Sequence, residues 1–220
     1  MMSVQNFKFA CIACILPGLL LQACTPNADI DPVKSQTTSG SPQTSIATIV
    51  GRAPEAAGGT RAVVILEPRE PLDVPLPTEP VEMDQFGRDF IPRLIVVRAG
   101  QPVLFKNSED ELHTVHVQDG QGLSLFNVAM PIQGGEHDHI FDDAGDYAVS
   151  CNAHQEMHAT IVVVESPYAV VADRDGTFTL SEMPPGSYDV TLRQGNQQHT
   201  ELVEILAGTN ELQLDFPSTN

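Results

Sequence analysis

Short runs of β-branched and aromatic residues, separated by turn-forming residues, recur from Ser45 to the end of the chain. No segment keeps an apolar period of 3.6 residues over three turns, so no amphipathic helix is expected. Many short strands divided by Gly, Pro, Asn and Asp are typical of a β-sandwich or barrel, and the sequence therefore predicts an all-β protein. The expected strands cover residues 46–51, 61–66, 94–98, 103–106, 113–117, 137–141, 147–150, 160–164, 168–172, 177–180, 188–192, 200–205 and 211–215. Residues 79–89 have no strong strand signal and are expected to be a linker or an irregular first strand.

The charge balance excludes one class of partner. The chain has 11 Lys and Arg residues against 29 Asp and Glu residues, a formal net charge of −18. So acidic a surface repels nucleic acid and favours a cation or a cationic partner. Nucleic-acid binding is therefore not expected.

The first 23 residues are predicted to be an export signal. Lys8 gives a positive start, and residues 9–21 form an apolar stretch of signal-peptide length. Residues 21–24, Leu-Gln-Ala-Cys, resemble the lipobox of bacterial lipoproteins. The resemblance implies cleavage before Cys24, lipidation of that cysteine and, with Thr25 after it, an outer-membrane anchor facing the periplasm. The alternative is secretion to the periplasm without lipidation.

The segment after the signal is predicted to be a flexible tether. Residues 24–44 are polar and rich in Ser, Thr and Pro, with no apolar period. Because Cys11 and Cys14 leave with the signal and Cys24 is lipidated, Cys151 would be the only thiol left. An unpaired thiol in an exported protein is open to oxidation, and metal ligation would protect it.

A set of metal-ligand residues surrounds that thiol. Cys151, His154 and Met157 form a Cys-x2-His-x2-Met loop after the expected strand 147–150, and His113 begins another expected strand. The short loop returns its three side chains to one point, and a neighbouring strand supplies the fourth. Thiolate, two imidazoles and a thioether are the ligand set of a type 1 copper centre. The sequence therefore predicts one copper ion that alternates between Cu(I) and Cu(II), with the solvent-facing edge of His154 as the exit for the electron.

Other candidate ligands have simpler explanations. His158 is the alternative to the axial methionine, which is favoured because a soft thioether is the usual weak axial ligand. His116 lies three residues after the upstream ligand, so strand alternation points it to the opposite face. His137 and His139 share one strand face and could bind a second metal, but they lack a third ligand nearby. The acidic run 109–111 is interpreted as a solvated turn.

Residues 81–165 resemble a cupredoxin of the amicyanin and plastocyanin type. The matching motifs are Gly-x-x-Val-x-Phe-x-Asn at residues 100–107, the strand–turn–strand at 141–147, and the short Cys-x2-His-x2-Met loop. The resemblance implies a Greek-key β-sandwich. It also implies that the two histidines and the cysteine are equatorial ligands and that Met157 is axial.

The sequence departs from that family around the ligands. Leu112 replaces the usual Pro, and Thr114 replaces the usual Asn but can still hydrogen-bond between the ligand loops. Gln155 and Glu156 replace a Pro and an aromatic residue. The mouth of the site would therefore be polar and negative, which favours a basic cytochrome as partner or no protein electron partner at all.

The flanking segments form a second predicted domain. Residues 45–80 with 166–217 resemble carboxypeptidase-regulatory-like, or transthyretin-like, β domains. The resemblance rests on the opening strands and on two tight turns, Asp-x-x-Gly at 173–176 and Pro-Pro-Gly-x-Tyr at 184–188. Residues 81–165 would then be inserted into this domain, and two domains in tandem are the alternative.

These features predict a lipid-anchored, periplasm-facing type 1 copper protein that carries single electrons. A cytochrome c or a periplasmic oxidoreductase is the expected partner, and the chain is expected to be a monomer. No triad order, phosphate loop, haem-attachment motif or carboxylate pair argues for catalysis, so the chain is predicted not to be an enzyme. The alternative is a copper protein for storage or delivery without redox turnover, which the polar mouth, the extra histidines and the negative charge would suit.

Overall fold

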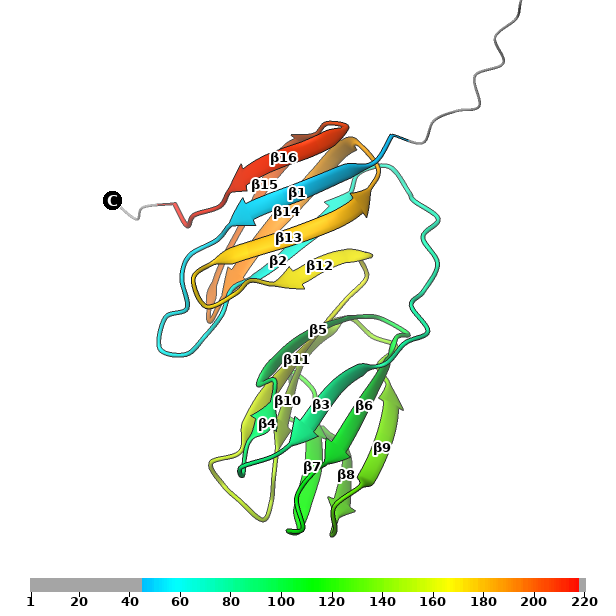
Figure 1. The fold of residues 1–220 in the computed structure, drawn as a ribbon, viewed down its shortest axis with the longest axis vertical. Helices are drawn as coiled ribbons and strands as arrows, with labels where there is room; N and C mark the ends of the chain where they lie inside the picture. The colour runs from blue at the N-terminus through cyan, green and yellow to red at the C-terminus, as the bar shows by residue number, and fades with distance from the viewer. Residues whose placement is uncertain (1–44, 218–220) are drawn as a thin grey trace, which may run out of the picture. The chain divides into compact units, whose positions relative to one another are not determined.

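The computed structural model describes residues 45–217 (Figure 1). Over this range the chain forms 16 strands and no helix, which confirms the predicted all-β class. The described residues therefore include no helix long and apolar enough to cross a membrane. The predicted signal peptide, Cys24 and the tether at 24–44 lie outside the described residues.

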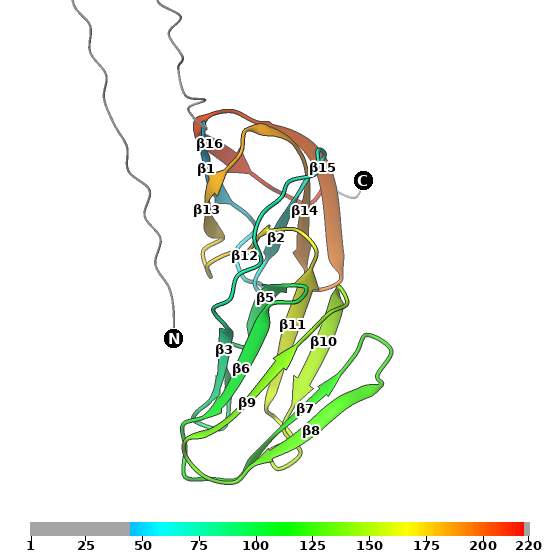
Figure 2. The same ribbon diagram turned by 90° about the vertical axis from the view of Figure 1, so that its right-hand side faces the viewer.

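One β-sandwich is built from β3 to β11. Its first sheet has the order β4-β3-β6-β9, and its second has the order β5-β11-β10-β7-β8. The two sheets can be followed in Figure 1 and, from the side, in Figure 2. The strands are β3 Val81–Gln85, β4 Phe90–Ile91, β5 Leu94–Arg98, β6 Pro102–Asn107, β7 His113–Gln118, β8 Ser124–Met130, β9 Gly135–Ile140, β10 Gly145–Ser150 and β11 His158–Val164. Two pairs, β3 with β6 and β5 with β11, are parallel.

Strand alternation places the apolar core between the two sheets. Every second residue of β6 and of β7 is buried, as a period of two requires. Phe105, Val115 and Val117 are fully buried members of this core. Each such side chain contributes about 1.5–3 kcal/mol by leaving water.

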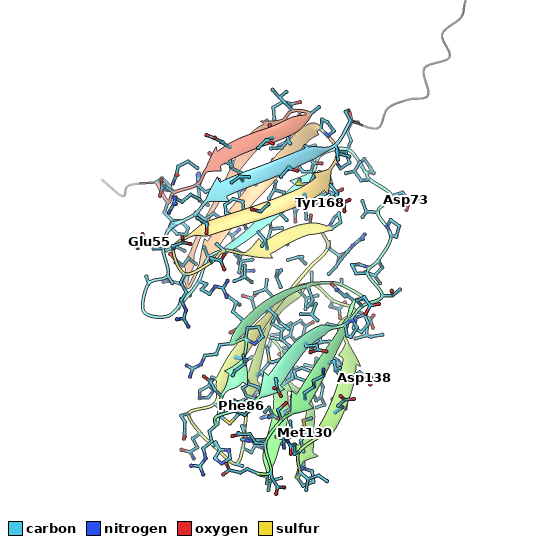
Figure 3. All side chains as sticks on the ribbon, viewed as in Figure 1. Glu55, Asp73, Phe86, Met130, Asp138 and Tyr168 are labelled. Carbon is cyan, nitrogen blue, oxygen red and sulfur yellow. The ribbon has the colours of Figure 1, made fainter. Side chains whose placement is uncertain are left out.

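One end of this sandwich collects the ends of several strands. Strand β3 ends at Gln85, opposite Asn107 at the end of β6. Strand β7 begins at His113, opposite Met130 at the end of β8. Figure 3 labels Met130, and Phe86 just after β3, at this end. The register therefore brings residues that are distant in sequence to one place.

A second sandwich is built from β1, β2 and β12 to β16. Its sheets have the orders β13-β1-β16 and β12-β2-β14-β15, so the two N-terminal strands lie in the same sheets as the C-terminal ones. The strands are β1 Ala47–Arg52, β2 Val63–Pro68, β12 Tyr168–Val171, β13 Thr177–Met183, β14 Gly186–Gln194, β15 Gln197–Ile205 and β16 Gly208–Gln213. Ile49, Leu66 and Tyr188 are among its fully buried side chains. Its assignment to the carboxypeptidase-regulatory-like family stays a prediction.

The sequence missed two strands, β4 and β8, and left a third open. Strand β3 lies in the segment 79–89, which was expected to be a linker or an irregular first strand; it is a strand, held by parallel pairing to β6. Strand β8 was not expected because apolar residues occupy both of its faces: Phe126 packs against the core while Leu125 is exposed. Strand β4 has only two residues, too few to give a period.

Candidate metal centre

The structure brings together three of the predicted ligands. His113 is the first residue of β7, Cys151 directly follows β10, and His154 lies in the loop that leads to β11. The Cys151 Sγ atom lies 3.9 Å from His113 Nδ1 and 3.8 Å from His154 Nδ1. The two Nδ1 atoms are 3.2 Å apart. The three side chains thus direct one sulfur and two nitrogens to a common point.

These three atoms have the spacing of a metal site. The centre of the triangle that they form is about 2.1 Å from each of them, and metal–nitrogen and metal–thiolate bonds in proteins measure about 2.0–2.3 Å. A trigonal set of one thiolate and two imidazoles is the donor set that blue copper sites use. The chemistry and the spacing of the donors therefore fit a single copper ion.

Met157, the fourth predicted ligand, ends the loop that contains Cys151 and His154, and backbone hydrogen bonds hold this loop together. The Cys151 N–H donates to the Met157 carbonyl oxygen at 3.2 Å, and the Met157 N–H donates to the His154 carbonyl oxygen at 3.1 Å. Met157 is fully buried and belongs to the same apolar cluster as Cys151. The alternative axial residue, His158, is exposed and begins β11. Met157 is therefore buried in the same cluster as the thiol, whereas His158 is exposed to solvent.

Thr114 links the two ligand segments. Its backbone N–H donates to Cys151 Sγ at 3.3 Å, and its hydroxyl lies 3.8 Å from the same sulfur. The Asn152 N–H donates to the Thr114 hydroxyl at 2.7 Å. The predicted hydrogen bond between the ligand loops is confirmed, and the buried sulfur is surrounded by donors suited to a thiolate.

Two buried amides hold the segment that carries His113. Asn107 donates to the carbonyl oxygens of Glu111 at 3.0 Å and Met130 at 2.9 Å, and its Oδ1 accepts the Glu109 N–H at 2.9 Å.

The second amide, that of Gln85, donates to the Thr114 carbonyl oxygen at 3.0 Å. Both amide residues are at least 99% buried, so these bonds are made away from water. They fix the backbone on both sides of the ligand.

A carboxylate contacts the outer nitrogen of each ligand histidine. Glu109 Oε2 lies 3.1 Å from His113 Nε2, and Glu111 Oε1 lies 3.1 Å from His154 Nε2. The Arg88 side chain forms two hydrogen bonds with the Glu111 carboxylate, and this lowers the pKa of Glu111 and raises the pKa of Arg88. The backbone N–H of Arg88 is the main cause of the lowered pKa of Glu109. The interpretation of residues 109–111 as a solvated turn is therefore incomplete, because both partly exposed glutamates also contact a ligand-candidate histidine.

No direct sequence signal indicated these outer residues. Arg88 lies in a stretch without a strand pattern, and Gln85 ends β3, the strand that the sequence left open. Only the parallel pairing of β3 with β6 brings both of them to the ligands. The spacing of Glu109 and His113, four residues apart, was the one pattern that could have indicated a contact.

The mouth of the site is more covered than the sequence suggested. The His154 side chain is only 14% exposed, and its outer nitrogen faces Glu111. Phe86 and Leu112, from the two segments beside it, are about half exposed. The exposed edge of His154 is therefore small, and charged and apolar groups lie together at this end.

The other histidines that the sequence offered as candidates, His116, His137 and His139, lie outside the group of ligand atoms. His116 is a partner of the Ser124 hydroxyl at 3.0 Å and does not reach the ligands. His137 and His139 pack against the ring of Phe126, and burial lowers the pKa of His139. Within residues 45–217, the groups of three or more metal-ligand residues all include His113. Neither His137 nor His139 belongs to such a group.

Comparison with known proteins gives a consistent family. The model of the copper-binding proteins of the plastocyanin/azurin family matches residues 80–164. No curated protein matches the chain. Among solved structures, a reduced amicyanin variant is 24% identical over 39% of this chain and 82% of its own, with a TM-score of 0.36. A purple cupredoxin from Nitrosopumilus maritimus is 19% identical over 38% of this chain and 99% of its own, with a TM-score of 0.35.

One comparison corrects a prediction. A copper-containing nitrite reductase from Thermus scotoductus is 24% identical over 45% of this chain and 25% of its own, with a TM-score of 0.35. The prediction that the chain is not an enzyme is therefore contradicted, because a similar fold also forms part of an enzyme. The prediction rested on the lack of a triad, a phosphate loop, a haem-attachment motif and a carboxylate pair, and copper chemistry needs none of these. On the family match and the donor geometry, residues 80–164 of this chain are a cupredoxin domain of the copper-binding plastocyanin/azurin family.

Proposed function

We propose that this protein is a type 1 copper protein that carries single electrons, with His113, Cys151 and His154 as equatorial ligands and Met157 as the axial ligand. The observation that carries the proposal is the triangle of one sulfur and two Nδ1 atoms, with sides of 3.2, 3.8 and 3.9 Å. When bound, copper supplies a centre that accepts and releases one electron. The donor set of thiolate, imidazoles and a long thioether changes little between the two oxidation states.

The protein contributes a rigid pocket to that chemistry. His113 and Met157 are fully buried, and Cys151 is 3% exposed. The ligand loop is closed by its own backbone hydrogen bonds and is tied to β7 through Thr114. Because the side chains have little freedom to move, little energy is needed to reorganise them when the charge of the site changes.

The proposed partner is a redox protein with a basic surface. Glu109 and Glu111 lie at the outer side of the ligands, and the exposed Glu156 lies in the ligand loop. An acidic rim attracts a basic partner over a range of about 8 Å at physiological salt. A cytochrome c in the periplasm has the right chemistry, and lipidation of Cys24 would hold the protein at the outer membrane.

The test is the visible spectrum of the full-length protein loaded with Cu(II). We expect an intense thiolate-to-copper band, its loss in Cys151→Ser, and its retention in His116→Ala, a matched histidine whose ring hydrogen-bonds with the Ser124 hydroxyl. A reversible one-electron potential should accompany the band. A wild-type protein without the band, or a Cys151→Ser variant that keeps it, would contradict the proposal.

Copper storage or delivery is the second candidate. It is favoured by the small exposure of His154, 14%, because a covered ligand edge suits retention more than fast transfer. Stoichiometry separates the two candidates. One tightly held copper with a reversible potential supports the carrier, whereas several exchangeable Cu(I) ions per chain support storage or delivery.

A further inference from the structure

The outer nitrogen of His154 is held by a group that the ligand spacing does not predict. His154 directs Nδ1 toward Cys151 Sγ and toward the other imidazole. A neutral imidazole has one proton, so a ring that ligates through Nδ1 has its N–H at Nε2. That N–H faces Glu111 Oε1 at 3.1 Å, which makes the carboxylate the acceptor.

The Glu111 carboxylate is itself fixed on two sides. Arg88 Nη2 donates to Oε1 at 2.8 Å, and Arg88 Nε donates to Oε2 at 3.2 Å. The carbonyl oxygen of Glu111 accepts a hydrogen bond from the buried Asn107. An exposed ion pair of this kind contributes little to folding stability. Because this ion pair contacts the outer nitrogen of His154, we expect it to affect the metal site more than the stability of the fold.

The two ligand histidines depend on their carboxylates to different degrees. His113 is fully buried in β7, so packing already fixes its ring. His154 lies in a loop and is partly exposed, so fewer atoms restrain it. The contact with Glu111 is therefore the main restraint on the outer edge of its ring.

We infer that Glu111 is a positioning residue that fixes the His154 ring and raises its basicity, and that Arg88 acts by holding Glu111. This inference rests on the proposed function. A carboxylate that accepts the outer N–H makes the imidazole a stronger donor. A stronger donor stabilises Cu(II) more than Cu(I), so the contact lowers the reduction potential of the site.

The first test compares Glu111→Ala and Glu111→Gln with the control Asp110→Asn in the full-length protein. Asp110 is exposed and adjacent, and its substitution removes the same charge. We expect Glu111→Ala to lower Cu(II) affinity about 10–100-fold and Cu(I) affinity less. Each tenfold loss of Cu(II) affinity relative to Cu(I) affinity raises the reduction potential by about 59 mV. Glu111→Gln should have a smaller effect, since its amide oxygen still accepts the N–H, and Asp110→Asn should change the affinity less than twofold.

The second test asks whether Arg88 acts through Glu111. Arg88→Ala should lower Cu(II) affinity less than Glu111→Ala does, and its effect should disappear in the Glu111→Ala background. If Glu111→Ala shifts the affinity ratio no more than Asp110→Asn, or if Arg88→Ala has the same effect in both backgrounds, the inference is overturned. Should Glu111→Ala unfold, the Glu111→Gln variant decides by the same comparison. Failure of the proposed function is distinguishable, because the wild-type protein would then lack the thiolate band altogether.

Discussion

Both sandwiches have an apolar core, but they differ in how many polar residues they bury and in where these residues lie. Of the four buried polar residues found between residues 45 and 217, three lie in the cupredoxin sandwich, all at the end where the ligands meet: Gln85, Asn107 and His113. The fourth, Ser166, lies outside that end and is satisfied by the Leu66 carbonyl oxygen. Burying a polar group costs free energy unless a partner is present. The concentration of such groups at one end therefore marks the place where the fold was shaped by something besides stability.

The largest expected effect is a loss of copper affinity at the metal site. His113→Ala removes a proposed copper ligand, so the loss of copper affinity should exceed the roughly 10–100-fold that follows removal of an outer partner. Titration with a competing chelator measures it, and His116→Ala is the control because that histidine lies on the same strand without reaching the ligands. Equal losses in both variants would mean that the copper is bound elsewhere.

The next effect concerns the second sandwich. Gly176 has a φ of +83°, and a Cβ at this residue would lie 2.0 Å from the Ala53 carbonyl oxygen. Gly176→Ala should therefore destabilise the protein by about 2–5 kcal/mol, from the left-handed backbone together with the overpacking. Urea unfolding measures this, and the thiolate-to-copper band of the folded protein should stay unchanged.

A matched glycine separates the two causes. Gly195 also has a positive φ, +59°, but nothing lies within 4 Å of its added Cβ. Gly195→Ala should cost only about 1–2 kcal/mol, the backbone contribution. If the two variants were equally destabilised, the contact with Ala53 would have no energetic role.

A smaller effect links stability to the site. Asn107→Ala leaves the carbonyl oxygens of Glu111 and Met130 and the N–H of Glu109 without their partner. Unsatisfied buried groups of this kind cost about 1–3 kcal/mol. Unlike Gly176→Ala, this variant should also broaden or shift the copper spectrum, because it frees the segment before His113. The exposed Asn127 provides the control substitution, Asn127→Ala, which should change neither property.

The sequence predicted the strands well where a run of β-branched apolar residues lies between turn-forming residues. Residues 94–98 were predicted as a strand and form β5 with the same bounds. Strand β3 was left open as a linker or an irregular strand because its identity depends on pairing with β6, a strand distant from it in the sequence. Local pattern contains no information on such pairing.

The same limit applies to the site. Cys151, His154 and Met157 lie close together in the sequence, so their spacing indicated a common centre. Arg88 and Gln85 reach that centre only through the register of the sheets, and Glu111, although close to His113 in sequence, contacts His154 of the other segment. The convergence of side chains that one loop supplies is therefore predictable, whereas the contacts that distant strands bring to them are not.

The smallest predicted effect is a pH dependence of stability. It compares the same kind of contact in the two sandwiches, a hydrogen bond from a buried tyrosine hydroxyl to a backbone carbonyl oxygen. Tyr188 in the second sandwich donates to the Pro184 carbonyl oxygen at 2.7 Å, and Tyr147 in the cupredoxin sandwich donates to the Asp143 carbonyl oxygen at 2.8 Å. Burial raises the pKa of both phenols, that of Tyr188 to about 12.

Because the folded pKa lies above the unfolded one, the neutral phenol stabilises the fold fully below pH 10.0, the ordinary value, and this contribution is lost as the pH rises toward about 12. The difference in unfolding free energy between the metal-free wild type and Tyr188→Phe should therefore shrink over that interval. Tyr147→Phe, the matched variant, should show the same sign with a smaller change. A difference that stayed constant from neutral pH to pH 12 would show that Tyr188 ionises without unfolding the sandwich, and that its burial is less complete than its packing indicates.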